Sequence, residues 1–165
     1  MELLSRIMVE KVSRRFEQLK NEIADSISAH GLTASGRTAQ SMHVVTTDYE
    51  VTLFGRNFFP ALETGSSRWT GATGYRCTFT EFRGIIQNWV QAKGLNFGQH
   101  KEHERVVDAI TATIIRKGTK QKRSGQRLDV YTTLVNQAVE DCGELVADVV
   151  GVSVDGIINK IWGAN

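Results

Sequence analysis

Proline and cysteine are scarce in this sequence, and long apolar runs are missing from it. A single proline in 165 residues favours long uninterrupted helices, because proline breaks the helical hydrogen-bond ladder. Two cysteines, Cys77 and Cys142, are too few for a disulfide framework or a four-ligand zinc site, and they suit a reducing cytoplasm. No apolar stretch approaches the roughly 18 residues of a membrane span, so we expect no membrane partner. Glu2, Arg6 and Glu10 interrupt the N-terminal segment, which argues against a secretory signal.

The length and the composition are those of one globular domain. A chain of this length buries about 70% of the surface that its unfolded form exposes, so its core needs no disulfide or metal support. The hydrophobic fraction of 41% and the charged fraction of 23% exclude a disordered chain and an integral membrane protein. We therefore expect residues 1–165 to form a single domain.

Residues 1–30 predict one long amphipathic helix. Gly31 follows the segment as a suitable C-terminal cap, since glycine accepts the left-handed conformation found there. Such a helix would be about 42 Å long, whereas the radius of gyration of a domain of this size is about 15 Å. We expect it to span the whole body or to protrude, so that a neighbouring subunit covers part of its apolar face. The apolar residues that define this face are Leu3, Leu4, Ile7, Met8, Val12, Phe16, Leu19, Ile23 and Ile27.

Residues 42–63 predict an antiparallel hairpin followed by an aromatic turn. The β-prone runs at 42–46 and 50–54 are separated by Thr47, Asp48 and Tyr49, a spacing typical of a tight hairpin. The aromatic turn that follows would also fit a short helix.

Residues 64–80 show no apolar period and contain three glycines. A connection of this length inside a small domain is usually functional or disordered. It also carries aromatic residues, which are favoured anchors at protein interfaces. We predict a flexible arm that binds outside its own core, with Trp69, Tyr75 and Phe79 as candidate subunit contacts.

Three helical segments are predicted in the C-terminal half. Two helices fall within residues 81–117, and Trp89 is expected in the core because it lies on the apolar face of the first. A third segment covers residues 129–162 with a break near Gly151. Trp162, at its end, could cover the core or act as a further subunit contact. The apolar residues of this third segment before the break are Leu134, Val135, Ala138, Val139, Cys142, Leu145, Val146, Val149 and Val150.

Positive charge is concentrated in one segment. Residues 116–127 contain six basic and no acidic residues, which leaves 14 basic and 18 acidic residues, or −4, in the rest of a chain whose total is +2. Clustered Lys and Arg bind a phosphate backbone by releasing counterions, although a solvated loop that keeps the protein soluble would have the same composition. The predicted loop at 118–128 has no aromatic residue, so we expect no recognition of single strands. The candidate contacts with DNA or an acidic partner are Arg116, Lys117, Lys120, Lys122, Arg123 and Arg127.

The sequence contains no convincing catalytic pattern. His100 and His103 could share a helix face and hold a metal, but no nearby motif supplies a third ligand, and a solvated first turn is the favoured interpretation. There is no G-x-S-x-G elbow, and the glycines at 71–74 lack the GK[ST] ending of a phosphate loop. We predict that the protein is not an enzyme and has no catalytic, metal-binding or cofactor-binding residues.

Several short motifs within residues 35–119 resemble the tail-completion and minor tail-component family of tailed bacteriophages. The first motif is Ser35, Gly36 and Arg37 with Ser41, before the hairpin, and the second is the segment 59–65 that ends in Leu62, Glu63, Thr64 and Gly65. A third pattern, similar to that of phage and prophage neck proteins, comprises Ile86, Trp89, Val90, Lys93, Gly94 and Leu95, then Ala109, Ile110, Ile114, Lys117, Gly118 and Thr119.

The resemblance implies an α+β fold, in which a long N-terminal helix packs on a small antiparallel β-sheet and further helices follow in the C-terminal half. It implies a structural virion protein, made in the bacterial host cytoplasm, that assembles into a ring at the head–tail junction around the DNA. The implied partners are further copies, neighbouring neck, portal-side or tail proteins, and packaged DNA through non-specific contact. We add Glu63, from the second motif, to the candidate subunit contacts.

Two other classes of protein remain open. The first is a small DNA-binding regulator that uses the helices of residues 82–118 together with the basic loop. The connection at 94–101 is longer than a usual helix-turn-helix turn, and the second helix has few side chains that could read bases. The second class is a small hydrolase built on His100 and His103, which has the least support.

Overall fold

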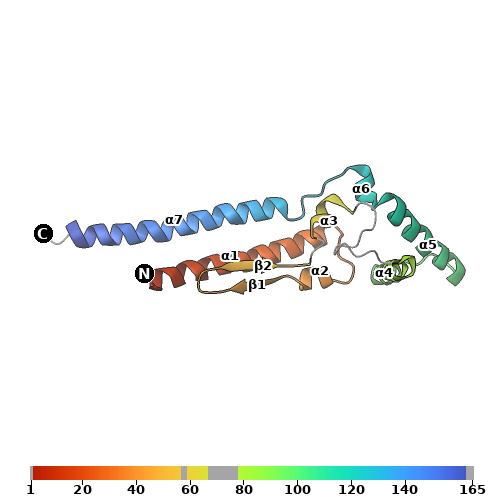
Figure 1. The fold of residues 1–165 in the computed structure, drawn as a ribbon, viewed down its shortest axis with the longest axis horizontal. Coiled ribbons are helices and arrows are strands. Elements are labelled where there is room, and N and C mark those ends of the chain that lie inside the picture. Colours follow the sequence, from red (N-terminus) through yellow and green to blue (C-terminus); the bar gives the residue numbers. More distant parts are fainter. Residues whose placement is uncertain (1, 57–58, 67–77, 163–165) are drawn as a thin grey trace.

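The computed structural model describes residues 2–56, 59–66 and 78–162, with side chains for residues 6–56, 59–66 and 78–151. The architecture is α+β, as expected: a long N-terminal helix, a small antiparallel sheet and further helices in the C-terminal half (Figure 1). The elements in chain order are α1 (Glu2–Ala29), α2 (Arg37–Gln40), β1 (His43–Thr46), β2 (Val51–Phe54), α3 (Phe59–Thr64), α4 (Phe79–Ala92), α5 (His100–Lys117), α6 (Lys120–Ser124) and α7 (Thr132–Trp162).

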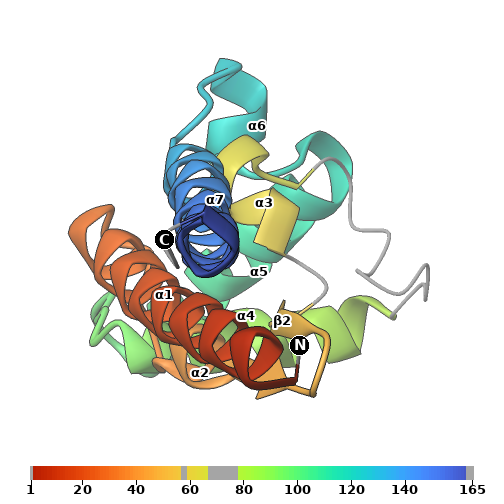
Figure 2. The same ribbon diagram turned by 90° about the vertical axis from the view of Figure 1, so that its left-hand side faces the viewer.

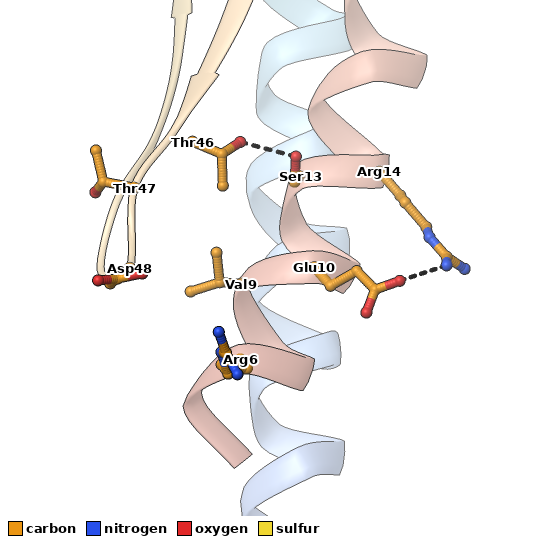
Figure 3. Close-up of a pocket in the computed structure, with 8 residues that line it drawn as sticks. All are labelled: Arg6, Val9, Glu10, Ser13, Arg14, Thr46, Thr47 and Asp48. Carbon is orange, nitrogen blue, oxygen red and sulfur yellow. Dashed lines mark hydrogen bonds and ion pairs between the residues drawn. The ribbon is translucent and has the colours of Figure 1, made fainter. Parts of the chain in front are cut away.

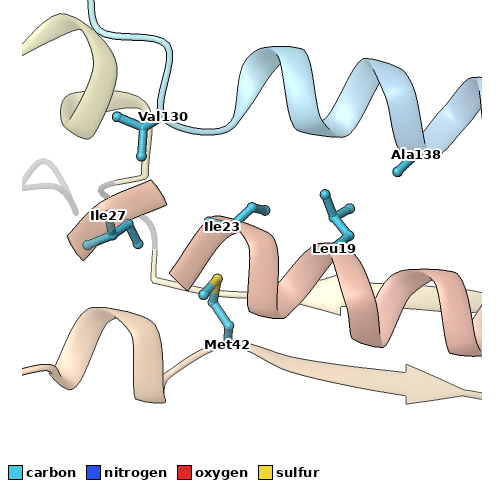
Figure 4. Packing of buried hydrophobic residues seen from close by; sticks show 6 residues of the cluster. All are labelled: Leu19, Ile23, Ile27, Met42, Val130 and Ala138. Carbon is cyan, nitrogen blue, oxygen red and sulfur yellow. The ribbon is translucent and has the colours of Figure 1, made fainter. Parts of the chain in front are cut away.

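Helix α1 is the central element of the larger part of the molecule. The hairpin lies along one side of α1 and α7 runs along another, with the two chain termini at the same end (Figures 1 and 2). Leu19, Ile23 and Ile27 repeat every four residues and are all buried, so one face of α1 supplies the core. Figure 4 shows these three side chains between the layers, together with the remaining buried members Met42, Val130 and Ala138.

The end of α1 is fixed by its local sequence. Gly31 has a φ of 66°, the left-handed conformation in which a Cβ is strongly disfavoured. Its amide donates to the carbonyl of Ser28 at 2.9 Å, and the amide of Leu32 donates to that of Ile27 at 3.0 Å. These two bonds form a Schellman motif, and the partly buried Leu32 packs against the core.

The hairpin is short and depends on α1. Strands β1 and β2 pair in antiparallel register, from His43 opposite Phe54 to Thr46 opposite Val51, close to the predicted runs. A two-stranded hairpin is at best marginally stable alone. Packing on α1 supports it, and the hydroxyl groups of Thr46 and Ser13 lie 2.9 Å apart.

Helices α4 and α5 form a separate pair at the other end of the molecule (Figure 1). They enclose a second apolar cluster of Phe82, Ile86, Val90 and Val107. Arg83 of α4 also pairs with two carboxylates of α5. The described part of the molecule therefore has two apolar clusters.

Two predicted element boundaries were wrong. Helix α7 continues through Gly151 without a break, because a single glycine in a helix costs about 1 kcal/mol but does not end it. The predicted arm at 64–80 is shorter, since α3 extends to Thr64 and α4 begins at Phe79. The Thr78 hydroxyl accepts from the Glu81 amide, and the Glu81 carboxylate accepts from the Thr78 amide, which forms a capping box that starts α4. The remainder of the predicted arm, 67–77, lies outside the described residues.

Two further expectations concern the exposure of Trp89 and membrane-spanning helices. Trp89 was expected in the core, but it is 40% exposed, because Phe82, Ile86 and Val90 form the buried face of α4 and Trp89 flanks it. In the described part of the chain, no helix combines the length and the apolar character needed to cross a bilayer.

Candidate functional site

The sequence predicted a free loop at 118–128. The structure instead contains the short helix α6 within this segment. Thr119 begins this short helix by accepting a hydrogen bond from the Lys122 amide through its hydroxyl. Gly125, with a φ of 68°, ends it. A threonine cap and a left-handed glycine five residues after the first helical position are enough to order one turn.

Helix α6 is held against the end of α3. The Thr119 amide donates to the Ser66 carbonyl at 3.0 Å, and the Ser66 amide donates to the Thr119 hydroxyl at 3.1 Å. The Gln121 side-chain amide donates to the carbonyl oxygens of Leu62 and Glu63. These bonds fix the position of the basic segment on the body.

Gly65 permits this close approach. Its φ is 68°, and a Cβ at this position would lie 2.5 Å from the Thr119 Oγ1 atom and 2.6 Å from the Lys122 nitrogen. A larger residue would therefore force α6 away from α3. Gly65 of the second phage-like motif is therefore required by the close packing of the α3 and α6 backbones.

Glu63 lies at the junction of α3, α6 and α7. Only 1% of its surface is exposed, so the candidate role of Glu63 as a subunit contact was wrong: the carboxylate is already used inside its own subunit. Its Oε1 atom accepts from the backbone amides of Val130, Tyr131 and Thr132 at 3.1, 2.9 and 2.8 Å. Its Oε2 atom accepts from the Thr132 hydroxyl at 2.6 Å and from Arg127 at 3.3 Å.

This carboxylate therefore caps the N-terminus of α7 from a distant part of the chain. Burial alone would raise the pKa of Glu63, but the hydrogen bonds from Thr132, Tyr131 and Arg127 outweigh it and lower the pKa from 4.5 to about 2. A negative charge at a helix N-terminus also interacts favourably with the helix dipole. The ionised form is thus the form that the fold selects.

The candidate basic residues differ in whether their side chains are bonded within the subunit. Arg127 is committed to Glu63, and Arg123 donates to the Gly118 carbonyl at 3.0 Å. The other four are exposed and make no side-chain hydrogen bond or ion pair with any residue that the structure describes. We call these four the basic surface: Arg116, Lys117, Lys120 and Lys122.

A second surface is the side of α7 that does not face α1. Ala138 and Val149 are buried, whereas Val139, Val146 and Val150 are 64%, 36% and 54% exposed. Helical spacing puts these three on one line with Gly143, which we call the outer stripe. In the sequence, the apolar residues of α7 form a single face. That face is wider than one neighbouring helix can cover, and its width is the signal that could have indicated the outer stripe.

Acidic residues occupy a third side of α7. Asp141 pairs with Arg15 at 2.7 Å, which joins α7 to α1. Glu140, Glu144 and Asp148 follow one another at intervals of four residues, are exposed, and have no ion-pair partner among the described residues. We call these three the acidic flank. Nothing in the sequence distinguishes this flank, because acidic residues on a helix usually indicate only solvation.

The exposed side of α4 is a further apolar patch. Ile85 is 49% exposed, next to Trp89. Of the predicted aromatic contacts, Phe79 opens α4 and is 46% exposed, whereas Trp69 and Tyr75 lie outside the described residues. The backbone at Trp162 ends α7, and its side chain also lies outside them.

The described residues do not assemble a catalytic centre. A hollow of about 410 Å³ lies between α1 and the hairpin turn, and it is wide open. In Figure 3 the Arg14 side chain turns away from it toward Glu10, and the Ser13 hydroxyl bonds the Thr46 hydroxyl, not a base. No group of three potential metal ligands occurs in the described part of the chain. His103, in the first turn of α5, packs beside the Phe97 ring.

Comparisons with protein-family models, curated proteins and solved structures gave no match to this chain.

Proposed function

We propose that the chain is a structural virion protein of a tailed phage. It would act as a neck, connector or tail-completion subunit that assembles into a ring at the head–tail junction around the DNA channel. The observation that carries the proposal is the outer stripe of α7, three exposed valines along a helix of 31 residues. Exposed apolar residues aligned along one helix face are typical of a surface that another protein covers.

The arrangement of the long helices supports assembly. Helices α1 and α7 contain 28 and 31 residues, which corresponds to about 42 and 46 Å. Helix α7 extends past the start of α1 (Figure 1). A projecting helix with an uncovered apolar side is suited to bridging adjacent subunits of a ring. Neighbouring neck, portal-side or tail proteins would contact the faces of that ring.

The phage-like motifs are a second line of support. Their implied ring would place many copies of the basic surface around one axis, where they could face packaged DNA or an acidic protein. Such contacts need no catalytic group.

Size measurement of the purified full chain, with light scattering, tests the proposal. We expect a closed oligomer, and electron-microscopy class averages should show rings with a central channel. A monomer at all concentrations, or an open-ended polymer, contradicts it.

The second candidate is a DNA-binding regulator that uses α4, α5 and the basic surface. It is favoured by four exposed basic side chains without described partners at the end of α5 and in α6. The exposed side of α4, however, is apolar at Ile85 and Trp89, which fits a protein contact better than a phosphate backbone. A dimer that shifts the mobility of duplex DNA, without rings, would favour this candidate.

A further inference from the structure

We propose that the outer stripe and the acidic flank of α7 bind the basic surface of a second copy of this chain, in a head-to-tail contact. This inference specifies the subunit contact of the proposed ring and rests on the proposed function only for the closure of that ring. The contact itself joins any two copies.

The acidic flank forms no ion pair within the described part of its own subunit. Residues 132–151 of α7 contain four acidic residues and no basic residue. Asp141 alone among them forms an ion pair with a described residue. Glu140, Glu144 and Asp148 are each four residues apart, a spacing at which like charges repel by about 0.2–0.5 kcal/mol per pair. An external cation would relieve this repulsion. Lys11 and Arg14 of α1 share an open hollow with Glu144 and Asp148, yet they form no ion pair with them.

The basic surface has the opposite charge and the same lack of compensation. Residues 116–127 contain six basic and no acidic residues, and only Arg127 pairs with a described carboxylate. The two uncompensated surfaces belong to one sequence. Each copy therefore carries both halves of a complementary contact.

The two surfaces are too far apart along the fold to meet within one copy. The acidic flank begins eight residues after the start of α7 and ends sixteen residues after it, about 12 to 24 Å along the helix. Helix α6 lies near the start of α7, and α7 runs away from it along the long axis of the molecule (Figure 1). Only a second copy can bring the surfaces together. Because they are different patches, the contact is heterologous, the type that generates rings.

The outer stripe fits this occupant as well. Lys and Arg side chains can lay their methylene stems on apolar surface while their charged ends stay hydrated or pair with carboxylates. Gly143 and Ala147 lie on the helix between the valines and the acidic flank, and a Cβ on Gly143 would contact nothing within 4 Å in the isolated subunit. The small residues leave room for the stems to cross from the valines to the carboxylates. DNA would be repelled by the same acidic flank, so it is not the occupant that this side of α7 favours.

Charge exchange in the full-length protein tests the proposal. The first variant carries Glu140→Lys and Glu144→Lys, and the second carries Lys120→Glu and Lys122→Glu. All four side chains are exposed and unpaired in the described subunit, so both variants should fold, which circular dichroism and melting curves can verify. We expect each variant alone to weaken self-association by about tenfold or more, measured by light scattering across a salt series.

Restoration is the decisive result. Mixing the two variants pairs the new lysines of one with the new glutamates of the other, and the chain with all four changes pairs with itself. Both should regain association near that of the wild type. The matched control is Lys101→Glu with Arg105→Glu, two exposed basic residues at the other end of α5, which should leave association unchanged.

The apolar part of the contact has its own variant. Val139→Ser with Val150→Ser should weaken association several-fold without a loss of salt dependence, whereas Val45→Ser, an exposed valine of the hairpin that is 41% accessible, should not. Equal association by every variant, or loss of DNA binding without any change in association after Lys120→Glu and Lys122→Glu, overturns the inference.

The outcomes separate this inference from the proposed function. Rings that survive the charge exchange would refute the α7 contact and leave the ring proposal standing. Association that follows the charge exchange but yields no closed ring would support the contact and refute the ring. A wild-type monomer refutes both.

Discussion

The α1–α7 body and the α4–α5 pair differ in how many neighbouring elements support their buried cores. In the body, α1 has neighbours on more than one side, and Leu19, Ile23 and Ile27 are 2–3% exposed. In the pair, each helix packs mainly on the other, and on α4 Val90 is fully buried whereas Ile85 remains 49% exposed. Several elements hold the core of the body, although α7 leaves its outer stripe exposed. The pair is stabilised by a small cluster and by the two ion pairs of Arg83. Regions of the second kind open at lower free-energy cost.

The largest predicted effect is at the junction that joins α3 to α7 within the body. Glu63→Gln should lower the free energy of unfolding by about 3 kcal/mol, because the neutral Gln loses the charge that five donors share and its NH2 group would face the Thr132 hydroxyl and Arg127 in place of Oε2. Urea unfolding measures the effect. Arg127→Gln is the control: Arg127 is 66% exposed, so its ion pair should contribute less than about 1 kcal/mol. Equal losses for the two variants would mean that Glu63 acts chiefly through Arg127.

The same carboxylate predicts a pH dependence. Its pKa is lowered from 4.5 to about 2 in the folded protein, so folding favours the ionised form. The stability that it contributes is complete above about pH 4.5 and is lost as the pH falls toward 2. Glu63→Gln should therefore flatten the stability curve in this window relative to the wild type. Parallel curves would contradict the assignment of the low pKa to Glu63.

The next effect compares buried and exposed positions on one helix of the pair. Val90→Ala should cost about 2 kcal/mol, because it leaves a cavity beside Val107, while Ile85→Ala should stay within about 0.5 kcal/mol. Hydrogen exchange is the suitable measurement, since we expect α4 and α5 to lose protection together after Val90→Ala while α1 stays protected. Loss of protection in α1 to the same extent would show that the two regions unfold as one unit.

The sequence predicted the elements better than it predicted their surroundings. The period of Leu19, Ile23 and Ile27 was enough to place α1, since one side of a helix repeats locally. The sequence did not reveal that Trp89 lies beside the buried face, because Trp89 and Val90 are adjacent in any helical pattern and the position of the partner helix decides between them.

The candidate site was harder to predict for the same reason. The role of Glu63 depends on amide groups of residues 130–132, more than sixty residues away, and no local pattern encodes that contact. The basic residues were found correctly as exposed charges. Some of these basic side chains are unpaired and others are bonded within the subunit. This difference depends on the formation of α6, which a threonine cap and a single glycine produce. The assignment of the chain to a phage neck stays a prediction.

The smallest expected effect is on the subunit itself when the basic surface is neutralised. Lys120→Gln with Lys122→Gln should change the free energy of unfolding by no more than about 0.5 kcal/mol, because both side chains are exposed and form no bond with a described residue. Two small effects oppose each other. Removing like charges relieves repulsion in α6, whereas Lys122 in the last turn is lost from a position where a cation favours the helix dipole. Both effects are screened by salt, so the difference from the wild type should vanish as salt rises.

Arg123→Gln is the comparison variant, since Arg123 donates to the Gly118 carbonyl and its loss should cost more, about 1 kcal/mol. Urea unfolding at low and high salt distinguishes these cases. A large, salt-independent loss for the lysine pair would mean that α6 depends on these side chains for its structure, and that the basic surface belongs with the body and not with the surfaces left open for partners.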